Sequence, residues 1–313
     1  YSLTCSSGMQ KSRLLEIDAS IQKADTRKTT AYVGTPERSL AGLAFLLLRH
    51  PSAKAVLSAA LQVVSGGGRL GWSNLAIRWY WRKHKQFLLI PPGGNSFWEK
   101  ARQGGKRRKG SAHASPRFLI TPITLRSKRD DFHCNYLVFD YLRKTLHRFE
   151  PYGATDRKFR PDKLDAALLA SFRAAFGKQV SLEQPREGKP PGEGIQELLE
   201  KELKAEGLEL ELGLCQAFGI LLVDLELGRI SEGEGERLSA AVANSLVTSH
   251  VANTGSVNAW ARGYAASLSR VVDVISARKI FAGLEGRECA QLSGIGGKRK
   301  IPRDLCSIRD QTL

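Results

Sequence analysis

Residues 214–227 place the strongest constraint on the fold, because they form an almost wholly apolar segment of helical length. A helix that is hydrophobic on nearly every side has to be buried on most of them. The sequence therefore predicts a central helix with other elements packed around it, and the rest of the chain has to supply those elements.

Strand-like segments come before this helix, at 118–125, 135–140 and 145–150, and a polar turn at 141–144 joins the last two as a hairpin. A further short strand is predicted at 179–182 and a strand at 87–90. Helices are predicted on both sides of these strands, at 39–50, 53–64, 161–176, 195–205, 233–253 and 257–281. Helices followed by strands and then by helices are typical of the α+β class.

Composition limits the partners and the compartment. The chain of 313 residues is 42% hydrophobic, which is enough for a sizeable core, and its formal charge of +17 favours anionic partners. Five scattered cysteines without a CxxC pair argue against disulfides and a zinc site, and favour an intracellular reducing compartment. The sequence has no Walker loop or HExxH motif, and no cofactor or metal is expected. The longest apolar run, 40–48, is too short to span a bilayer.

Cys215 is the candidate nucleophile, because it lies at the start of the apolar helix. A helix N-terminus presents unpaired N–H groups and the positive end of a dipole, and both favour a reactive thiolate. Gly213, just before it, allows a tight turn and close approach by a substrate. The alternative interpretation is a buried cysteine that only fills the core.

His133 and Glu150 are the candidate base and orienting acid. His133 begins the strand before the 141–144 turn and Glu150 ends the strand after it, so a hairpin would bring the two side chains together. A carboxylate there can hold the imidazole in one tautomer and stabilise its charged form. Asp140 is the weaker candidate acid, because it lies at the turn end of the hairpin. The alternative for His133 is a surface histidine without a role.

Gln196 is the candidate oxyanion donor. Its side-chain amide, together with the backbone N–H of Cys215, would stabilise a tetrahedral oxyanion. The alternative is an exposed glutamine in the first turn of a charged helix.

These residues carry a resemblance. His133-x-Asn135-Tyr-Leu-x-x-Asp140, then Arg148-Phe-Glu150-Pro-Tyr-Gly153, Gly194-x-Gln196 and Gly213-x-Cys215 resemble cysteine-peptidase-like proteins of large DNA viruses and eukaryotes, distant relatives of the SUMO-protease and adenovirus-protease clan. Clan members share the order His, acid, Gln, Cys. Here a charged helix separates Gln196 from Cys215, the acid is Glu rather than Asp, and Phe218 stands where many relatives have Trp.

The resemblance covers about 118–227 and implies a papain-like fold of the ubiquitin-like-protein protease type. That fold has a central, mostly antiparallel sheet flanked by helices, here with helical terminal extensions. The expected division is an extended arm over 1–38, a cysteine-peptidase-like domain over 39–253, and a C-terminal helix with a basic tail over 254–313. The implied substrate is a ubiquitin-like conjugate or a polyprotein, cleaved in the cytoplasm, nucleus, virion or organelle matrix.

Basic clusters keep a second function open. Clusters of lysine and arginine favour the binding of phosphates. The aromatic and basic stretch 79–85 also has residues that can stack on unpaired bases. The alternative interpretation is a solvated loop, a solubilising tail and an amphipathic helix with core tryptophans. A basic, non-catalytic subunit of a ribosome or virion, and a simple module that binds RNA or DNA, are therefore also considered. The clusters are Lys106, Arg107, Arg108 and Lys109, and Lys298, Arg299 and Lys300.

Overall fold

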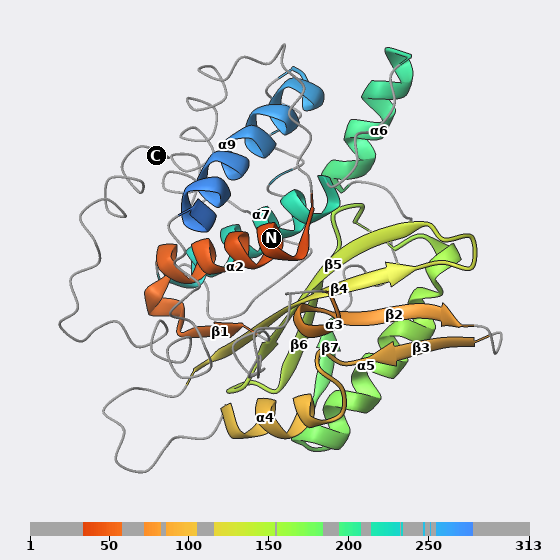
Figure 1. Cartoon of the computed structure of the whole chain (residues 1–313), viewed down its shortest axis with the longest axis vertical. Coiled ribbons are helices and arrows are strands. Elements are labelled where there is room, and N and C mark those ends of the chain that lie inside the picture. The colour runs from red at the N-terminus through yellow and green to blue at the C-terminus, as the bar shows by residue number, and fades with distance from the viewer. Residues whose placement is uncertain are drawn as a thin grey trace, which may run out of the picture.

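The computed structural model of the chain describes residues 34–57, 72–82, 86–104, 116–153, 155–183, 194–207, 214–231 and 255–277, together with Gly233, Val247 and Val251. The described part has helices on both faces of one sheet (Figure 1). Its elements are α2 (Pro36–Arg49), η1 (Pro51–Ala53), β1 (Ala55–Leu57), α3 (Trp72–Leu75), β2 (Ile77–Arg82), β3 (Gln86–Ile90), α4 (Ser96–Gly104), β4 (Phe118–Arg126), β5 (Phe132–Asp140), β6 (Thr145–Phe149), η3 (Arg157–Phe159), α5 (Pro161–Phe176), β7 (Ser181–Glu183), α6 (Ile195–Ala205), α7 (Leu214–Ser231) and α9 (Val257–Ala277).

The sheet is mixed, with the order β3-β2-β4-β5-β6-β7. β1 pairs with the first residues of β4 and β2 with its last residues, so both lie along one edge of β4. The pairs β2–β3, β4–β5 and β5–β6 are antiparallel, whereas β1–β4, β2–β4 and β6–β7 are parallel. The α+β class is therefore confirmed. The sheet is mixed, and its longest pairing, β4–β5, is antiparallel as predicted.

Alternation along β5 divides the core into two layers. Cys134, Tyr136 and Val138 lie in the hydrophobic cluster that contains α7, whereas Leu137 and Phe139 lie in the cluster that contains α5. Successive side chains of a strand point to opposite faces, so β5 separates the two layers. In Figure 1, α2, α7 and α9 lie over one face of the sheet, and α4 and α5 over the other.

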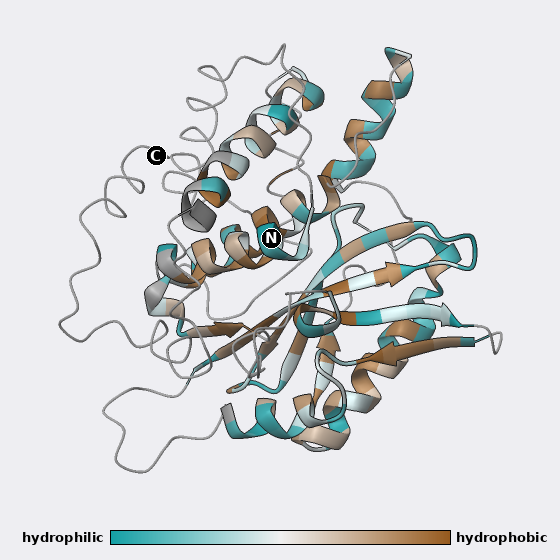
Figure 2. Ribbon diagram, viewed as in Figure 1, coloured by the Kyte–Doolittle hydropathy of each residue, from teal (hydrophilic) through white to brown (hydrophobic). Residues whose placement is uncertain are grey.

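Helix α7 forms the centre of the first layer, as its apolar sequence predicts. It packs against β5 on one side and against α2, α6 and α9 on others. Gly219 allows the contact with β5, because a Cβ atom there would lie 2.2 Å from the Tyr136 ring. Helix α6 is instead amphipathic: it buries Ile195, Leu199 and Leu203, and Figure 2 shows hydrophobic and hydrophilic residues alternating along it.

Several predicted elements need correction. The alternative interpretation of 79–85 as an amphipathic helix is wrong, because residues 79–82 belong to strand β2, which is hydrogen-bonded to β3 and β4. Residues 83–85 lie outside the described part. The helix predicted at 53–64 is wrong at its start, because Ala55–Leu57 form β1. Helix α2 begins at Pro36 rather than at 39, because Thr35 caps it by accepting the N–H of Arg38.

The C-terminal helix α9 packs against α2 and α6 and contributes to the same hydrophobic cluster as α7. The three-part division at residues 38 and 253 stays a prediction, since residues 1–33 and most of 234–254 lie outside the described residues. None of the helices in the described ranges combines the length and apolar character needed to cross a bilayer.

Candidate active site

Cys215 is the second residue of α7, and its side chain reaches the end of the sheet where β5 begins. The residue is 8% exposed. Hydrogen bonding and charge from Cys215 raise the pKa of His133, so the thiol lies beside the imidazole. Because Cys215 stands in the first turn of an 18-residue helix, unpaired N–H groups and the positive dipole end lie beside the sulfur.

His133 is the second residue of β5 and is held between two aromatic rings. The ring of Tyr152 lies 5.2 Å from it and that of Phe159 6.0 Å, measured between centroids. Its Nε2 atom lies 2.7 Å from Oε1 of Glu150. With Nε2 engaged by the carboxylate, Nδ1 is the ring nitrogen left for the thiol of Cys215. The predicted nucleophile, base and acid are thus brought together by α7, β5 and the residue after β6.

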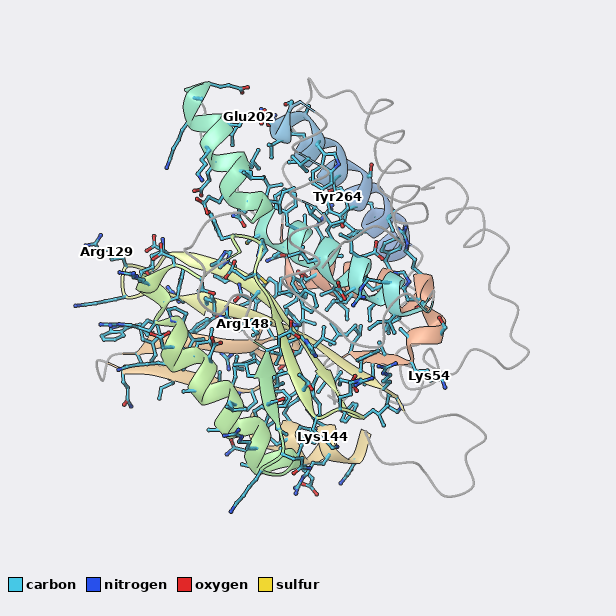
Figure 3. The ribbon with its side chains drawn as sticks, turned by 180° about the vertical axis from the view of Figure 1, so that it is seen from behind. Lys54, Arg129, Lys144, Arg148, Glu202 and Tyr264 are labelled. Atoms are coloured by element: carbon cyan, nitrogen blue, oxygen red, sulfur yellow. The ribbon has the colours of Figure 1, made fainter. Side chains whose placement is uncertain are left out.

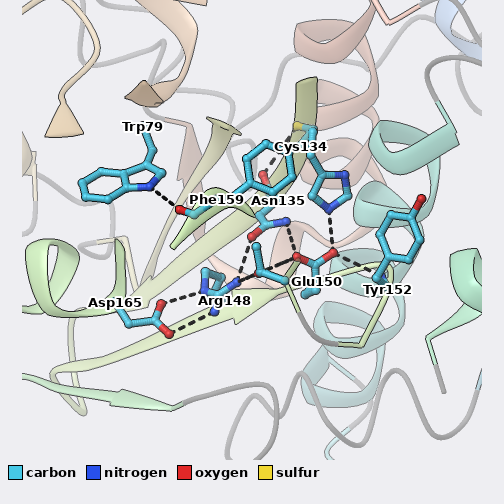
Figure 4. Close-up of polar contacts among 10 residues, drawn as sticks. Trp79, Cys134, Asn135, Arg148, Glu150, Tyr152, Phe159 and Asp165 are labelled. Atoms are coloured by element: carbon cyan, nitrogen blue, oxygen red, sulfur yellow. Dashed lines mark hydrogen bonds and ion pairs between the residues drawn. The ribbon is translucent and has the colours of Figure 1, made fainter. Parts of the chain in front are cut away.

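The carboxylate of Glu150 is fully buried and receives hydrogen bonds from several groups (Figure 4). Oε1 accepts from His133 and from the backbone N–H of Tyr152, at 3.1 Å. Oε2 accepts from Asn135 at 2.8 Å and from Thr155 at 2.6 Å. A carboxylate held on both oxygens is fixed in orientation, so the imidazole that it bonds is fixed as well.

Arg148 connects this arrangement to helix α5. Its guanidinium makes a forked contact with Asp165, with Nε at 2.8 Å and Nη2 at 3.0 Å from the two carboxylate oxygens. Nη1 donates to Oδ1 of Asn135 at 2.9 Å and to the hydroxyl of Thr155. The guanidinium lies 3.9 Å from Glu150. Figure 3 shows Arg148 in the interior of the molecule, beside the sheet.

The electrostatics of the pair favour its charged form. Burial lowers the pKa of His133, but the negative charge of Glu150, the hydrogen bond to Cys215 and the hydrogen bond to Glu150 raise it, to about 10. Burial raises the pKa of Glu150, but His133, Arg148 and Thr155 lower it, to about 2. Histidine and glutamate therefore form an imidazolium–carboxylate pair at neutral pH.

Gln196 is buried rather than exposed, so its expected alternative role as a solvated helix residue is wrong. Its backbone N–H donates to the carbonyl of Pro151 at 3.1 Å, and Gly194 donates to Tyr152 at 3.2 Å. These bonds tie the start of α6 to the loop that carries Glu150. The Oε1 atom of Gln196 is buried without a hydrogen-bond partner among the described residues. No contact between its side chain and Cys215 is established.

The buried network behind Glu150 has members to which the sequence analysis gave no role: Asn135, Arg148, Thr155 and Asp165. A signal was present for two of them. Asn135 stands two residues after His133 on β5, and Arg148 two residues before Glu150, so each pair points to one face of the sheet. Thr155 and Asp165 follow in the loop and in α5, where no short-range pattern marks them.

The basic clusters at 106–109 and 298–300 lie outside the described residues. Within the aromatic stretch, Trp79 is buried and its Nε1 donates to the carbonyl of Phe159 at 2.7 Å, so this tryptophan belongs to the core. In the part of the chain that the structure describes, no group of three or more His, Cys, Asp or Glu side chains is arranged to hold a metal ion.

Comparison of the chain with known protein families, with curated proteins and with solved structures gives no match.

Proposed function

We propose that the protein is a thiol peptidase of the papain-like type, with Cys215 as nucleophile, His133 as base and Glu150 as the orienting acid. The observation that carries the proposal is the meeting of three side chains from distant segments: a thiol at a helix start, an imidazole within its reach, and a buried carboxylate 2.7 Å from the imidazole. A nucleophile, an adjacent base and a third group that orients the base are the combination typical of nucleophilic catalysis by cysteine.

The proposed reaction runs in two steps. His133 takes the proton of the Cys215 thiol and the sulfur attacks a peptide carbonyl carbon. The C–N bond then breaks as His133 donates that proton to the leaving amine. A water molecule then attacks the thioester, giving its proton to His133, and the carboxylic acid leaves as the thiol is restored. Glu150 keeps the imidazole oriented and stabilises its charged form in each step.

The oxyanion of each tetrahedral intermediate needs hydrogen-bond donors. The backbone N–H of Cys215 is one candidate, since it belongs to the unpaired first turn of α7. Gln196 is the other, supported by its burial and by the bonds that tie its backbone to the Pro151–Tyr152 loop. The proposed substrates are a ubiquitin-like conjugate or a polyprotein, cleaved after a small residue such as glycine.

Labelling of the full chain with a ubiquitin-like protein or a peptide that carries a thiol-reactive carbonyl group tests the proposal. Cys215→Ala is expected to abolish the labelling. Cys134→Ala is the matched control and is expected to keep it, because burial and the nearby charges of Cys215 and Glu150 raise the pKa of the Cys134 thiol. Labelling that survives Cys215→Ala would remove the peptidase proposal.

A non-catalytic role is the second candidate, favoured by the net charge of +17 and by the low exposure of the candidate site, with Cys215 8% and His133 5% exposed. In that case the same fold acts as a basic subunit of a particle that contains nucleic acid. Fixed stoichiometry in such a particle, together with an unreactive Cys215, would favour it over the peptidase.

A further inference from the structure

The turn between β4 and β5 ends in an exposed aromatic residue directly before the candidate base. Phe132 precedes His133 and is 48% exposed, although it is a large hydrophobic side chain. The ring of Trp72 lies 6.3 Å from it, measured between centroids. Phe132 is also the Cα partner of Arg126 across the β4–β5 pair, so a cation flanks the aromatic ring.

Exposed cations surround this aromatic residue on the turn and on the neighbouring loop that contains η3. Six cations and three carboxylates are exposed or half-buried there, which leaves a net charge of +3. We call Phe132 and these six cations the hairpin-tip surface. The cations are Arg126, Lys128, Arg129, Arg157, Lys158 and Arg160, and the carboxylates are Asp130, Asp131 and Asp156.

The turn that presents these cations is held in one conformation. The Ser127 hydroxyl accepts the N–H groups of Arg129 and Asp131 and donates to the Asp131 carboxylate at 2.8 Å. The ammonium group of Lys128 lies 5.9 Å from the centre of the Trp81 ring. Cations on an ordered backbone lose less conformational entropy when a partner binds.

The two loops are joined to each other and to the candidate site. Lys158 lies 3.7 Å from Asp131, which links the η3 loop to the turn. The same ammonium lies over the ring of Phe159, and that ring packs on His133. Lys158, one of the cations of the hairpin-tip surface, is therefore linked through the buried Phe159 ring to one side of the imidazole.

The other side of the imidazole leads to a surface of opposite sign. Tyr152 packs on His133 and its hydroxyl donates to Glu200 of α6. Between residues 197 and 206, α6 and its C-terminal turn carry four glutamates and two lysines, a net charge of −2. A chain that crosses the site thus passes from a positive surface to a negative one.

We infer that the hairpin-tip surface binds an acidic segment of the polypeptide substrate, with an apolar side chain against Phe132 and carboxylates against the surrounding cations. This inference rests on the proposed peptidase function. An aromatic residue with a charged rim that includes arginine is the usual composition of a protein-binding hot spot. A polypeptide is favoured over nucleic acid because three carboxylates are interleaved with the cations and would repel a continuous phosphate backbone.

Binding can be measured separately from catalysis with the full-length Cys215→Ala protein and fluorescence anisotropy. The probe is a labelled peptide in which glutamates flank a Leu-Phe pair on both sides. Charge reversal by K128E, R129E and K158E together is expected to weaken binding at least about tenfold, as is F132S alone. The matched control reverses K54E, R102E and K178E; Figure 3 shows Lys54 at the opposite end of the molecule from Arg129.

The control triple variant is expected to bind the peptide as tightly as the Cys215→Ala protein without charge reversals. An equal loss of peptide binding in both triple variants would overturn the inference, because net charge alone would then explain the loss. Tighter binding of a labelled oligouridylate than of the peptide would also overturn it, in favour of RNA. Peptide binding that follows the expected pattern while Cys215 resists labelling would reject the peptidase proposal and leave the acidic-segment surface standing.

Discussion

His133 Nε2 lies 2.7 Å from Oε1 of Glu150, and the same carboxylate is held on its other oxygen by Asn135 and Thr155. His133 is the second residue of β5, and Glu150 directly follows β6. Both side chains are almost wholly inaccessible, so their charges are not screened by water. A buried pair of this kind controls the protonation of the imidazole.

The imidazole of His133 is expected to stay charged through neutral pH and to titrate near pH 10, since Glu150 and Cys215 raise its pKa from 6.5 to about 10 against the effect of burial. A raised folded-state pKa contributes stability that is fully present below pH 6.5 and is lost as the pH rises toward 10. NMR titration of the ring measures this, with His133→Gln to identify the resonance. A midpoint near the ordinary histidine value would contradict the prediction.

At acid pH the same pair acts through Glu150. Its pKa is lowered from 4.5 to about 2, so its contribution to stability is present above pH 4.5 and disappears as the pH falls toward 2. Thermal unfolding followed between these pH values is expected to show this loss in the wild type and a smaller one in Glu150→Gln. Equal slopes in the two proteins would show that Glu150 does not carry the effect.

Glu150→Gln is also expected to reduce peptide hydrolysis by a factor of roughly 100 or more, because the imidazole loses its orienting charge. Asp140→Asn is the matched control. Asp140 accepts the N–H groups of Leu142 and Arg143 in the hairpin turn, far from the imidazole. This variant is expected to lose stability and to keep the titration of His133. If both variants lose hydrolysis equally, the orienting role of Glu150 is wrong.

Arg148→Met is expected to lower the free energy of unfolding by about 3–5 kcal/mol, because it leaves Asp165 buried without its forked partner. Asp165 is bonded to Arg148 at 2.8 and 3.0 Å. The double variant Arg148→Met/Asp165→Leu removes both charges and is expected to recover part of the loss. Urea unfolding of the two single variants and the double variant measures the coupling. Additive losses would show that the pair is not coupled.

Local pattern predicted the parts of the fold in which neighbours in sequence are neighbours in space. The hairpin of β5 and β6 could be read from two alternating segments and a polar turn, and the central position of α7 from its apolar character. The hairpin also explains why His133 and Glu150 were paired on the sequence alone. The contacts that determine the hairpin join residues within about twenty positions of each other in the sequence. The central position of α7 follows from the burial that an apolar helix needs.

The elements that could not be predicted are set by pairing over long distances. β1 is three residues long and pairs in parallel with β4, more than sixty positions later. The aromatic and basic residues of β2 fit an amphipathic helix as well as a strand, and the pairing with β4 and β3 selects the strand. Arg148 is paired with Asp165 only because α5 returns across the sheet. A single sequence holds no local signal for such contacts.

Gly194 has no side chain, and this lets α6 approach the loop after Glu150. A Cβ atom at this position would lie 2.1 Å from the carbonyl carbon of Tyr152 and 2.3 Å from the carbonyl oxygen of Pro151, both backbone atoms. Gly194→Ala is therefore expected to displace the start of α6, which carries Gln196. Overpacking of this kind lowers the free energy of unfolding by about 1–3 kcal/mol.

Displacement of Gln196 would move the proposed oxyanion donor, and a shift of about 1 Å at a catalytic site reduces turnover by roughly a hundredfold. Gly207→Ala is the matched control at the other end of α6. Its φ of +70° makes alanine strained, but no atom lies within 4 Å of the new Cβ. Both variants should lose stability, and only Gly194→Ala should slow labelling by a peptide ketone while leaving alkylation of Cys215 by iodoacetamide unchanged. Equal labelling rates in the two variants would show that Gln196 takes no part in the reaction.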